Sequence, residues 1–325
     1  MKKRLDNLRI TKYNTFPKSK KLRFPFDEKL LKLLKKENKF QQDYYYVERD
    51  EDYAFIIVYK MKMNIFTFGK LDLSLNTNVI GYPCSLSEEG FITNNQELVL
   101  EFAKTLKGPV LVLNVKNGIY NKDFLLGETL PTCMFNVNYS SIDDYIKNLR
   151  SSYRRRINIA INNSSNIKVK KITDNSVDVY NLYENTFNKS NYKLEKLEKG
   201  FFEDIDATKL VFIKNNKTVG FVLLKKIDNK LEFMLCGMDY SFDTTDLYYF
   251  MLLNIIKYAI DNKCKIINFG QTSEETKMKF GATLEKRYFY AHHSNRFINY
   301  LVKHGKSLLE YKYKFPEYHV IKEKK

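Results

Sequence analysis

The stretch KLEFMLCGMDYSFDTTDLYYFMLLNIIKYAIDNKCKIINFG, residues 230–270, decides the fold. Residues 230–239 are mostly apolar and alternate, which indicates a strand. Thr244 or Thr245 then caps a long helix that extends to about Asn262. Residues 265–270 indicate a second strand. A strand, a helix and a strand in this order form a crossover between parallel strands.

The segments on either side of this stretch extend the pattern. Residues 210–216, 218–228 and 230–239 indicate three successive antiparallel strands joined by short polar turns. Before them, a helix from Asp143 to about Ile161 precedes a strand at 167–172 and helices at 177–190 and 197–205. After residue 270 come a short helix and a strand at 287–294. This order predicts an α/β fold with a mixed sheet over residues 165–294.

The first part of the chain shows a shorter version of the same order. Residues 45–116 indicate strands, then a helix at 94–106 and a strand at 109–115 that follows Gly108, a helix-ending residue. We therefore expect two related parts: an N-terminal part, 1–130, in which the pattern is degenerate, and a C-terminal part, 131–325, that ends in a basic helix and tail.

The composition is basic, with a net charge of +17 and a pI near 9.4 over 325 residues. This charge favours anionic partners such as nucleic acid, an acidic membrane surface or phosphorylated small molecules, or it reflects a general enrichment in Lys. Four widely spaced cysteines predict reduced thiols and a cytoplasmic location. The start of the chain shows no signal peptide, and the longest apolar stretch is too polar to span a bilayer.

Three motifs together resemble the GNAT superfamily of acyltransferases, in particular the Fem-like proteins. They are RRRINIAIN at 154–162, the helix–strand–Phe-Gly segment at 246–273, and ETKMKFGATLEKRYFY at 275–290. The resemblance covers residues 132–294 and implies two tandem GNAT-like halves. It also implies an enzyme that transfers an acyl group to an amine acceptor, a small molecule or an envelope precursor. The donor is acyl-CoA or acetyl-CoA in most of the superfamily and aminoacyl-tRNA in the Fem-type ligases.

One segment departs from the family's pattern. The loop at 238–246 contains no glycine where CoA-binding members have a glycine-rich phosphate loop, and it holds Asp239, Asp243 and Asp246. Acidic residues stabilise the first turn of a helix but repel a pyrophosphate. This departure leaves room for aminoacyl-tRNA as the donor.

Arg156 and Lys277 are the expected cations of a donor- or substrate-binding site. On a helical plot Arg156 falls inside an apolar stripe, three residues after Tyr153. It therefore needs an anionic partner, either a ligand or a protein carboxylate such as Glu232 or Glu184. Lys277 matches a lysine that the Fem-type enzymes place near the donor, although it is alternatively a solvated surface lysine.

Four further residues are candidates for chemistry. Glu232 is a candidate general base, or else a surface acid at a strand edge. Tyr248, at the start of the long helix, is a candidate proton donor to the leaving group, or a packing residue. Gln271 and Thr272 follow a strand at its carboxyl end and are candidates for donor or substrate binding, or for capping the next helix. No metal-ligand spacing is present.

A second class of function stays open. The basic segments 18–23 and 150–171 and the lysine-rich tail are also typical of a non-enzymatic protein that binds nucleic acid or a membrane surface. Such binding would weaken steeply with salt.

Overall fold

The computed structural model describes residues 7–14, 26, 28–69, 71–84, 86–174, 176–241 and 244–322. The basic segment 18–23 and Asp243 lie outside these residues. The chain divides into two units, and each unit contains a mixed sheet of its own. Unit 1 comprises residues 1–130, 194–198 and 286–313, and unit 2 comprises residues 131–193, 199–285 and 314–325. No described helix is long and apolar enough to cross a membrane.

The sheet of unit 2 has seven strands in the order β14-β8-β13-β12-β11-β10-β9. All neighbours are antiparallel except β12 and β13, which are parallel and are joined by a long helix, as the sequence predicts. The strands are β8 (Thr132–Asn136), β9 (Lys168–Ile172), β10 (Thr208–Lys214), β11 (Lys217–Ile227), β12 (Lys230–Met238), β13 (Ile266–Asn268) and β14 (Thr283–Glu285).

Helices cover both faces of this sheet. Val222 and Leu224 of β11 share one core with helices α4 (Ser151–Asn163) and α7 (Thr244–Asp261). Phe221, the residue before Val222, points to the other face, where its ring meets Phe202 of α6 (Lys199–Asp204). Helix α5 (Tyr180–Lys189) also lies on that face, while α8 (Glu274–Met278) follows β13.

The helix predicted from Asp143 to Ile161 is broken in the structure. Helix α3 (Ile142–Asn148) ends at Leu149, whose backbone is extended and forms a β-bridge with Ile321 near the C-terminus. The backbone N–H of Arg150 donates to the carbonyl of Val320 at 2.9 Å, and α4 begins at the next residue. The break is caused by pairing with a distant segment, which helical periodicity cannot reveal.

The sheet of unit 1 repeats the order of unit 2. Its main path is β1-β2-β3-β4-β6-β15-β7, in which only β4 and β6 are parallel, and β5 pairs with β3. The strands are β1 (Arg9–Tyr13), β2 (Gln42–Arg49), β3 (Asp52–Asn64), β4 (Ser74–Ile80), β5 (Phe91–Thr93), β6 (Pro109–Val115), β7 (Leu125–Glu128) and β15 (Tyr288–His293). The helices are α1 (Glu28–Glu37), α2 (Gln96–Ala103), α9 (Arg296–His304) and α10 (Lys306–Leu309).

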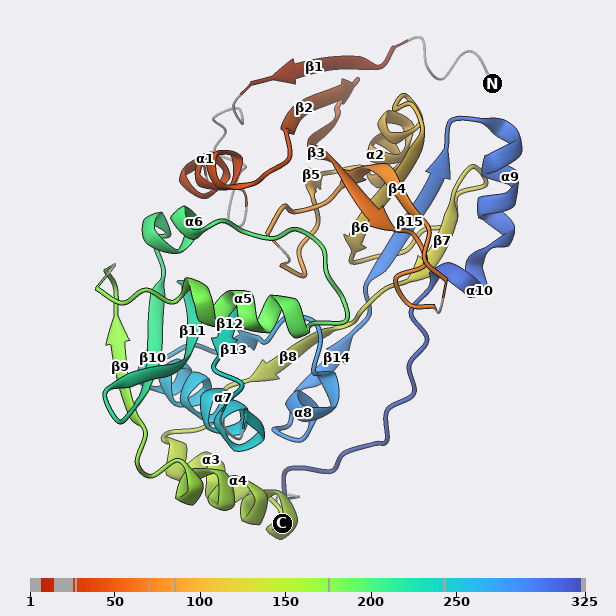
Figure 1. Ribbon diagram of the computed structural model, residues 1–325. Coiled ribbons are helices and arrows are strands. Elements are labelled where there is room, and N and C mark those ends of the chain that lie inside the picture. The colour runs from red at the N-terminus through yellow and green to blue at the C-terminus, as the bar shows by residue number, and fades with distance from the viewer. Residues whose placement is uncertain are drawn as a thin grey trace. The chain divides into compact units, whose positions relative to one another are not determined.

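The sheet of unit 1 contains one strand from the second half of the sequence, whereas every strand of the unit 2 sheet lies after residue 130. In unit 1 β15 lies between β6 and β7, and in unit 2 the equivalent place between β13 and β14 is taken by β8. Figure 1 shows the blue β15 beside the yellow β7. The strand predicted at 287–294 therefore exists, but its expected place in the sheet of the second half is wrong. The division into domains at residues 130 and 131 stays a prediction.

Candidate functional site

The candidate site lies in unit 2, where the two parallel strands part. Residues 230–232 of β12 pair with residues 266–268 of β13, and the ladder then stops although β12 continues to Met238. In open α/β sheets, ligands bind beyond the carboxyl ends of parallel strands at such points. The helix α7 that joins these strands starts beside the same end of β12.

A β-bulge in β12 decides which side chains face this site. Leu223 of β11 pairs with Leu235, and Leu224 pairs with Phe233, so Met234 is the extra residue. Phe233, Cys236 and Met238 consequently all face the core that contains α7. Strict alternation along β12 would place Cys236 and Phe233 on opposite faces of the sheet. The bulge brings them to the same face, so that expectation is wrong.

Lys277 is the charged residue most deeply enclosed at this site. Only 2% of it is exposed, although it comes from the short helix α8. Its Nζ donates to the carbonyl of Gln271 at 2.8 Å and to that of Gly270 at 3.5 Å, and it lies 6.0 Å from the centre of the Phe233 ring. Burial lowers the pKa of Lys277. The alternative of a solvated surface lysine is therefore wrong.

Tyr248 and two thiols surround this lysine. Burial raises the pKa of Tyr248 well above its usual value, while a hydrogen bond with the Ser273 side chain opposes that rise. Burial also raises the pKa of Cys133 and of Cys236 to about 11, and nearby Lys277 opposes both rises. Tyr248 and both cysteines are thus protonated at neutral pH, and they interact electrostatically with one another.

The loop that receives the lysine's hydrogen bonds has an unusual backbone. Gly270, Thr272 and Ser273 have positive φ angles of 71°, 63° and 51°. Such a conformation is rare for a β-branched residue and costs about 1–3 kcal/mol for each non-glycine residue. The conformation turns the carbonyls of Gly270 and Gln271 toward Lys277. Sequence reasoning selected Gln271 and Thr272 by their place after a strand, and the structure brings this loop to Lys277.

Glu274 is a residue that the sequence did not single out. It is 5% exposed, and no group within the part of the chain that the structure describes is hydrogen-bonded to its Oε1. Its carboxylate acts on Lys277, raising the pKa of the lysine against the effect of burial. Residue type alone does not distinguish it from the ordinary acids of a first helical turn.

Glu232 lies away from this group of residues. It directly precedes Phe233 in a regular part of β12 and therefore points to the opposite face. It is buried, and its carboxylate forms an ion pair with Lys230 at 2.6 Å. The structure thus separates the two residues that the sequence proposed as catalytic, Glu232 and Tyr248.

Arg156 contacts the start of α7. Its Nη1 lies 2.7 Å from Oδ1 of Asp246, and its guanidinium lies 4.0 Å from the centre of the Tyr249 ring. Among the described residues, Nη1 of Arg156 has no partner with hydrogen-bond geometry, so its contact with Asp246 is an ion pair. Its protein carboxylate is therefore neither Glu232 nor Glu184, the two acids that the sequence suggested.

Asp239, before α7, and Asp246, in its first turn, both have neighbouring groups that offset their negative charge. A hydrogen bond from Lys217, helped by Ser241, lowers the pKa of Asp239 to about 2. A hydrogen bond from Asn163, followed by contact with Arg156, lowers the pKa of Asp246. Their repulsion of an incoming phosphate is therefore weaker than the sequence alone suggests. Among the described residues, no group of three or more His, Cys, Asp or Glu side chains is arranged to hold a metal ion.

Comparison with known proteins supports the fold. No family model matches the chain. No curated protein matches its sequence either. A solved structure from Agrobacterium fabrum, the C-terminal domain of a putative lysylphosphatidylglycerol synthetase, has a TM-score of 0.52 at 9% identity. That match covers 79% of this chain and 85% of the other.

Two further structures have lower scores. FemX gives a TM-score of 0.47 at 12% identity, covering 83% of this chain and 92% of that one. A tandem GNAT protein from the clavulanic acid biosynthesis pathway gives 0.48 at 7% identity, covering 79% and 84%. Identities this low bear on the fold alone. Together with the strand order, the similarity to the Agrobacterium domain supports a mixed α/β fold in which two mixed sheets share one strand order.

Proposed function

We propose that the chain is an N-acyltransferase whose reaction takes place in unit 2, beside Lys277. The observation that carries this proposal is the buried ammonium group of Lys277 at the parting of β12 and β13. An ammonium group has three N–H donors, and the carbonyls of Gln271 and Gly270 accept two of them. The third donor is then directed at a bound acyl carbonyl, whose oxygen becomes negative as the amine attacks.

The neighbouring residues supply the two proton transfers that acyl transfer to an amine requires. Tyr248 stays protonated and is held by Ser273, so it is suited to protonate the leaving group. We assign the role of general base to Glu274, because its buried carboxylate faces Lys277 and has an oxygen without a hydrogen bond among the described residues. Gln271 and Thr272 form the loop on which donor or acceptor rests, and Arg156 orients the start of α7 through Asp246.

Acyl-CoA is the favoured donor, because the neighbours of Asp239 and Asp246 offset the negative charges that would repel its pyrophosphate. The second candidate donor is aminoacyl-tRNA, as in a Fem-type ligase. The glycine-free loop and the net charge of +17 favour it. The acceptor is then an amine on a small molecule or on an envelope precursor.

A binding screen separates the two donors. Thermal unfolding of the full chain is measured with acetyl-CoA, longer acyl-CoAs and bulk aminoacyl-tRNA, each at low and high salt. A rise in melting temperature with a CoA thioester at both salt concentrations supports acyl-CoA. A response to aminoacyl-tRNA alone, abolished by salt, supports the ligase instead. A chain that responds to neither donor contradicts the proposal.

Replacement of Lys277 tests the mechanism. In Lys277→Met the stem is kept and the ammonium group is lost, so kcat is expected to fall by about 10²–10³, as when an oxyanion donor is removed. Lys279→Met, two residues on, is the matched control, because that lysine is paired at the surface with Glu275. Equal activity of the two variants would show that Lys277 has no part in the reaction.

A further inference from the structure

Helix α9 in unit 1 turns its apolar side outward. Phe297, Tyr300 and Leu301 are 72%, 59% and 53% exposed. At about 100° per residue these three side chains lie on one side of the helix. The helix is described in full, and none of its side chains is buried. A surface helix normally buries such a stripe, so the orientation of α9 is the reverse of the usual one.

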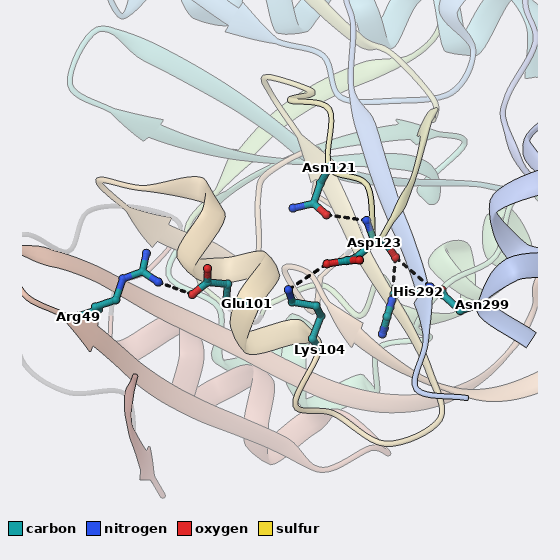
Figure 2. A network of polar contacts seen from close by, with 7 residues as sticks. All are labelled: Arg49, Glu101, Lys104, Asn121, Asp123, His292 and Asn299. Carbon is teal, nitrogen blue, oxygen red and sulfur yellow. Dashed lines mark hydrogen bonds and ion pairs between the residues drawn. The ribbon is translucent and has the colours of Figure 1, made fainter. Parts of the chain in front are cut away.

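Polar bonds on the inner side hold α9 in this orientation. Asn299 donates to the backbone carbonyl of Asp123 at 3.0 Å, and its own carbonyl oxygen accepts from the backbone N–H of His293 at 2.9 Å. Nδ1 of His292 donates to the same Asp123 carbonyl at 3.0 Å, and the Asp123 carboxylate pairs with Lys104 at 3.2 Å. Figure 2 shows the contacts of Asp123 with Lys104, His292 and Asn299. The outward side is therefore a fixed feature of the fold.

A neighbouring loop adds to the apolar surface. The ring of Phe68 lies 5.0 Å from that of Tyr311, and a Cβ built on Gly69 would lie 3.9 Å from the carbonyl of Leu308. The loop after β3 thus lies against the segment that follows α9. Leu308 and Leu71, on these two segments, are both more than half exposed.

The charged residues of α9 are all positive. Residues 296–305 contain Arg296 and Lys303 and no acidic residue, while Lys306, at the start of α10, pairs with Glu310 at 3.7 Å. A second copy of the chain would bring the same positive charges to a symmetric contact, and each copy carries a net charge of +17. A surface that is both apolar and cationic is instead complementary to anionic lipid headgroups above an apolar interior.

We propose that the α9 face, consisting of Phe297, Tyr300, Leu301 and Leu308 with the flanking cations Arg296 and Lys303, docks unit 1 onto an anionic lipid bilayer surface. The apolar side chains enter the boundary between headgroups and acyl chains, and the Tyr300 hydroxyl stays at headgroup level. This inference is independent of the acyltransferase proposal, because it concerns the other unit and needs no donor or acceptor.

Vesicle co-sedimentation of the full chain tests the proposal. Vesicles of phosphatidylcholine alone are compared with vesicles of phosphatidylcholine and phosphatidylglycerol. We expect binding to the anionic vesicles only, weakened by salt. Phe297→Ser is expected to reduce the affinity about tenfold or more, because a large apolar side chain no longer enters the bilayer. Lys303→Glu is expected to reduce it at least about fivefold.

Matched controls lie in unit 2. Ile159→Ser changes an exposed apolar residue of α4, and Lys168→Glu changes an exposed lysine of β9. Both are expected to bind as the unaltered chain does, and all four variants to keep its melting temperature. Equal loss of binding in variants and controls would overturn the proposal. So would light scattering that shows a dimer which Phe297→Ser converts to a monomer, since the occupant would then be a second copy.

Discussion

Thr272 holds a left-handed backbone conformation that its β-branched side chain disfavours. Thr272→Gly is expected to raise the free energy of unfolding by about 1 kcal/mol by removing this strain. The same change frees the Gln271 carbonyl that fixes Lys277, so acyl transfer is expected to fall. Urea unfolding and initial rates measure the two effects.

The control for strain alone is Lys263→Gly, which removes a positive φ of 56° at the end of α7. It is expected to stabilise the fold without changing the rate. If Thr272→Gly also leaves the rate unchanged, the strained loop has no part in holding Lys277.

His292 gives the stability of unit 1 a dependence on pH. Burial lowers the pKa of His292, although the Asp123 carbonyl opposes the effect. Below about pH 6.5 the unfolded chain binds a proton at this residue that the folded chain does not. The contribution of neutral His292 is therefore present above that pH and is lost as the pH falls toward the folded-state pKa.

His292→Asn keeps a donor for the Asp123 carbonyl but does not titrate. As the pH falls below 6.5, we expect the free energy of unfolding of His292→Asn to fall less steeply than that of the unaltered chain. Lys104 and His293, which also act on residue 292, are left in place in this variant. Chemical denaturation at several pH values measures this slope. His319→Asn, at an exposed position, is the control, and an equal effect of the two substitutions would exclude a role for burial.

At the residue scale, Lys277 was selected by its motif, Tyr248 by its place at the start of a helix, and Gln271 and Thr272 by their place after a strand. The structure brings these residues together in unit 2, and their roles stay predictions. Glu232 was expected beside the site but lies on the opposite face of β12, because the extra residue Met234 reverses the face on which the following residues lie. Glu274 was missed because burial, and not residue type, distinguishes it from an ordinary acid in a first helical turn.

Among the elements, β12 and α5 approach so closely that a side chain is excluded between them. A Cβ built on Gly237 would lie 2.4 Å from the carbonyl carbon of Leu182 and 2.5 Å from the Phe221 ring. Gly237→Ala is therefore expected to cost about 1–3 kcal/mol, because helix backbone has to move.

Gly220→Ala on the adjacent strand is the control for this substitution. Its added Cβ meets the flexible sulfur of Met251 at 3.3 Å, so it is expected to cost less than about 1 kcal/mol. Equilibrium unfolding in urea measures both variants. Equal losses would contradict the close packing of α5 against β12.

Local pattern predicted the elements well where local interactions decide them. The apolar periodicity of 244–262 and the turns of 210–239 were sufficient for α7 and the three-stranded meander. Pattern failed where a distant partner decides, as at Leu149, whose bridge with Ile321 interrupts a periodic helix. It also failed at β15, because alternation identifies a strand but not the sheet that accepts it.

For the whole molecule, the place of β15 in the sheet of unit 1 makes the first half of the sequence depend on the second. Fragment 1–130 lacks the strand between β6 and β7, whereas fragment 131–325 retains every strand of the unit 2 sheet and contains β15 without either neighbour. We expect fragment 1–130 not to unfold cooperatively by itself. Near-ultraviolet circular dichroism and thermal melts of each fragment, separately and mixed, test this.

The mixed fragments provide the control, since association restores both ladders and is expected to recover a cooperative transition. A cooperative melt of fragment 1–130 alone, at the temperature of the full chain, would contradict the expectation.

The place of β15 in the sheet of unit 1 has a consequence for synthesis on the ribosome. Strands β6 and β7 are complete early, but β15 emerges only after residues 131–285, which contain every strand of unit 2, have been translated. Until then β6 and β7 have no strand between them, and the unpaired edges and apolar faces of unit 1 are open to other chains. About 160 residues separate β7 from β15. At roughly 5–20 residues per second, their translation sets a delay during which a nascent chain depends on chaperones.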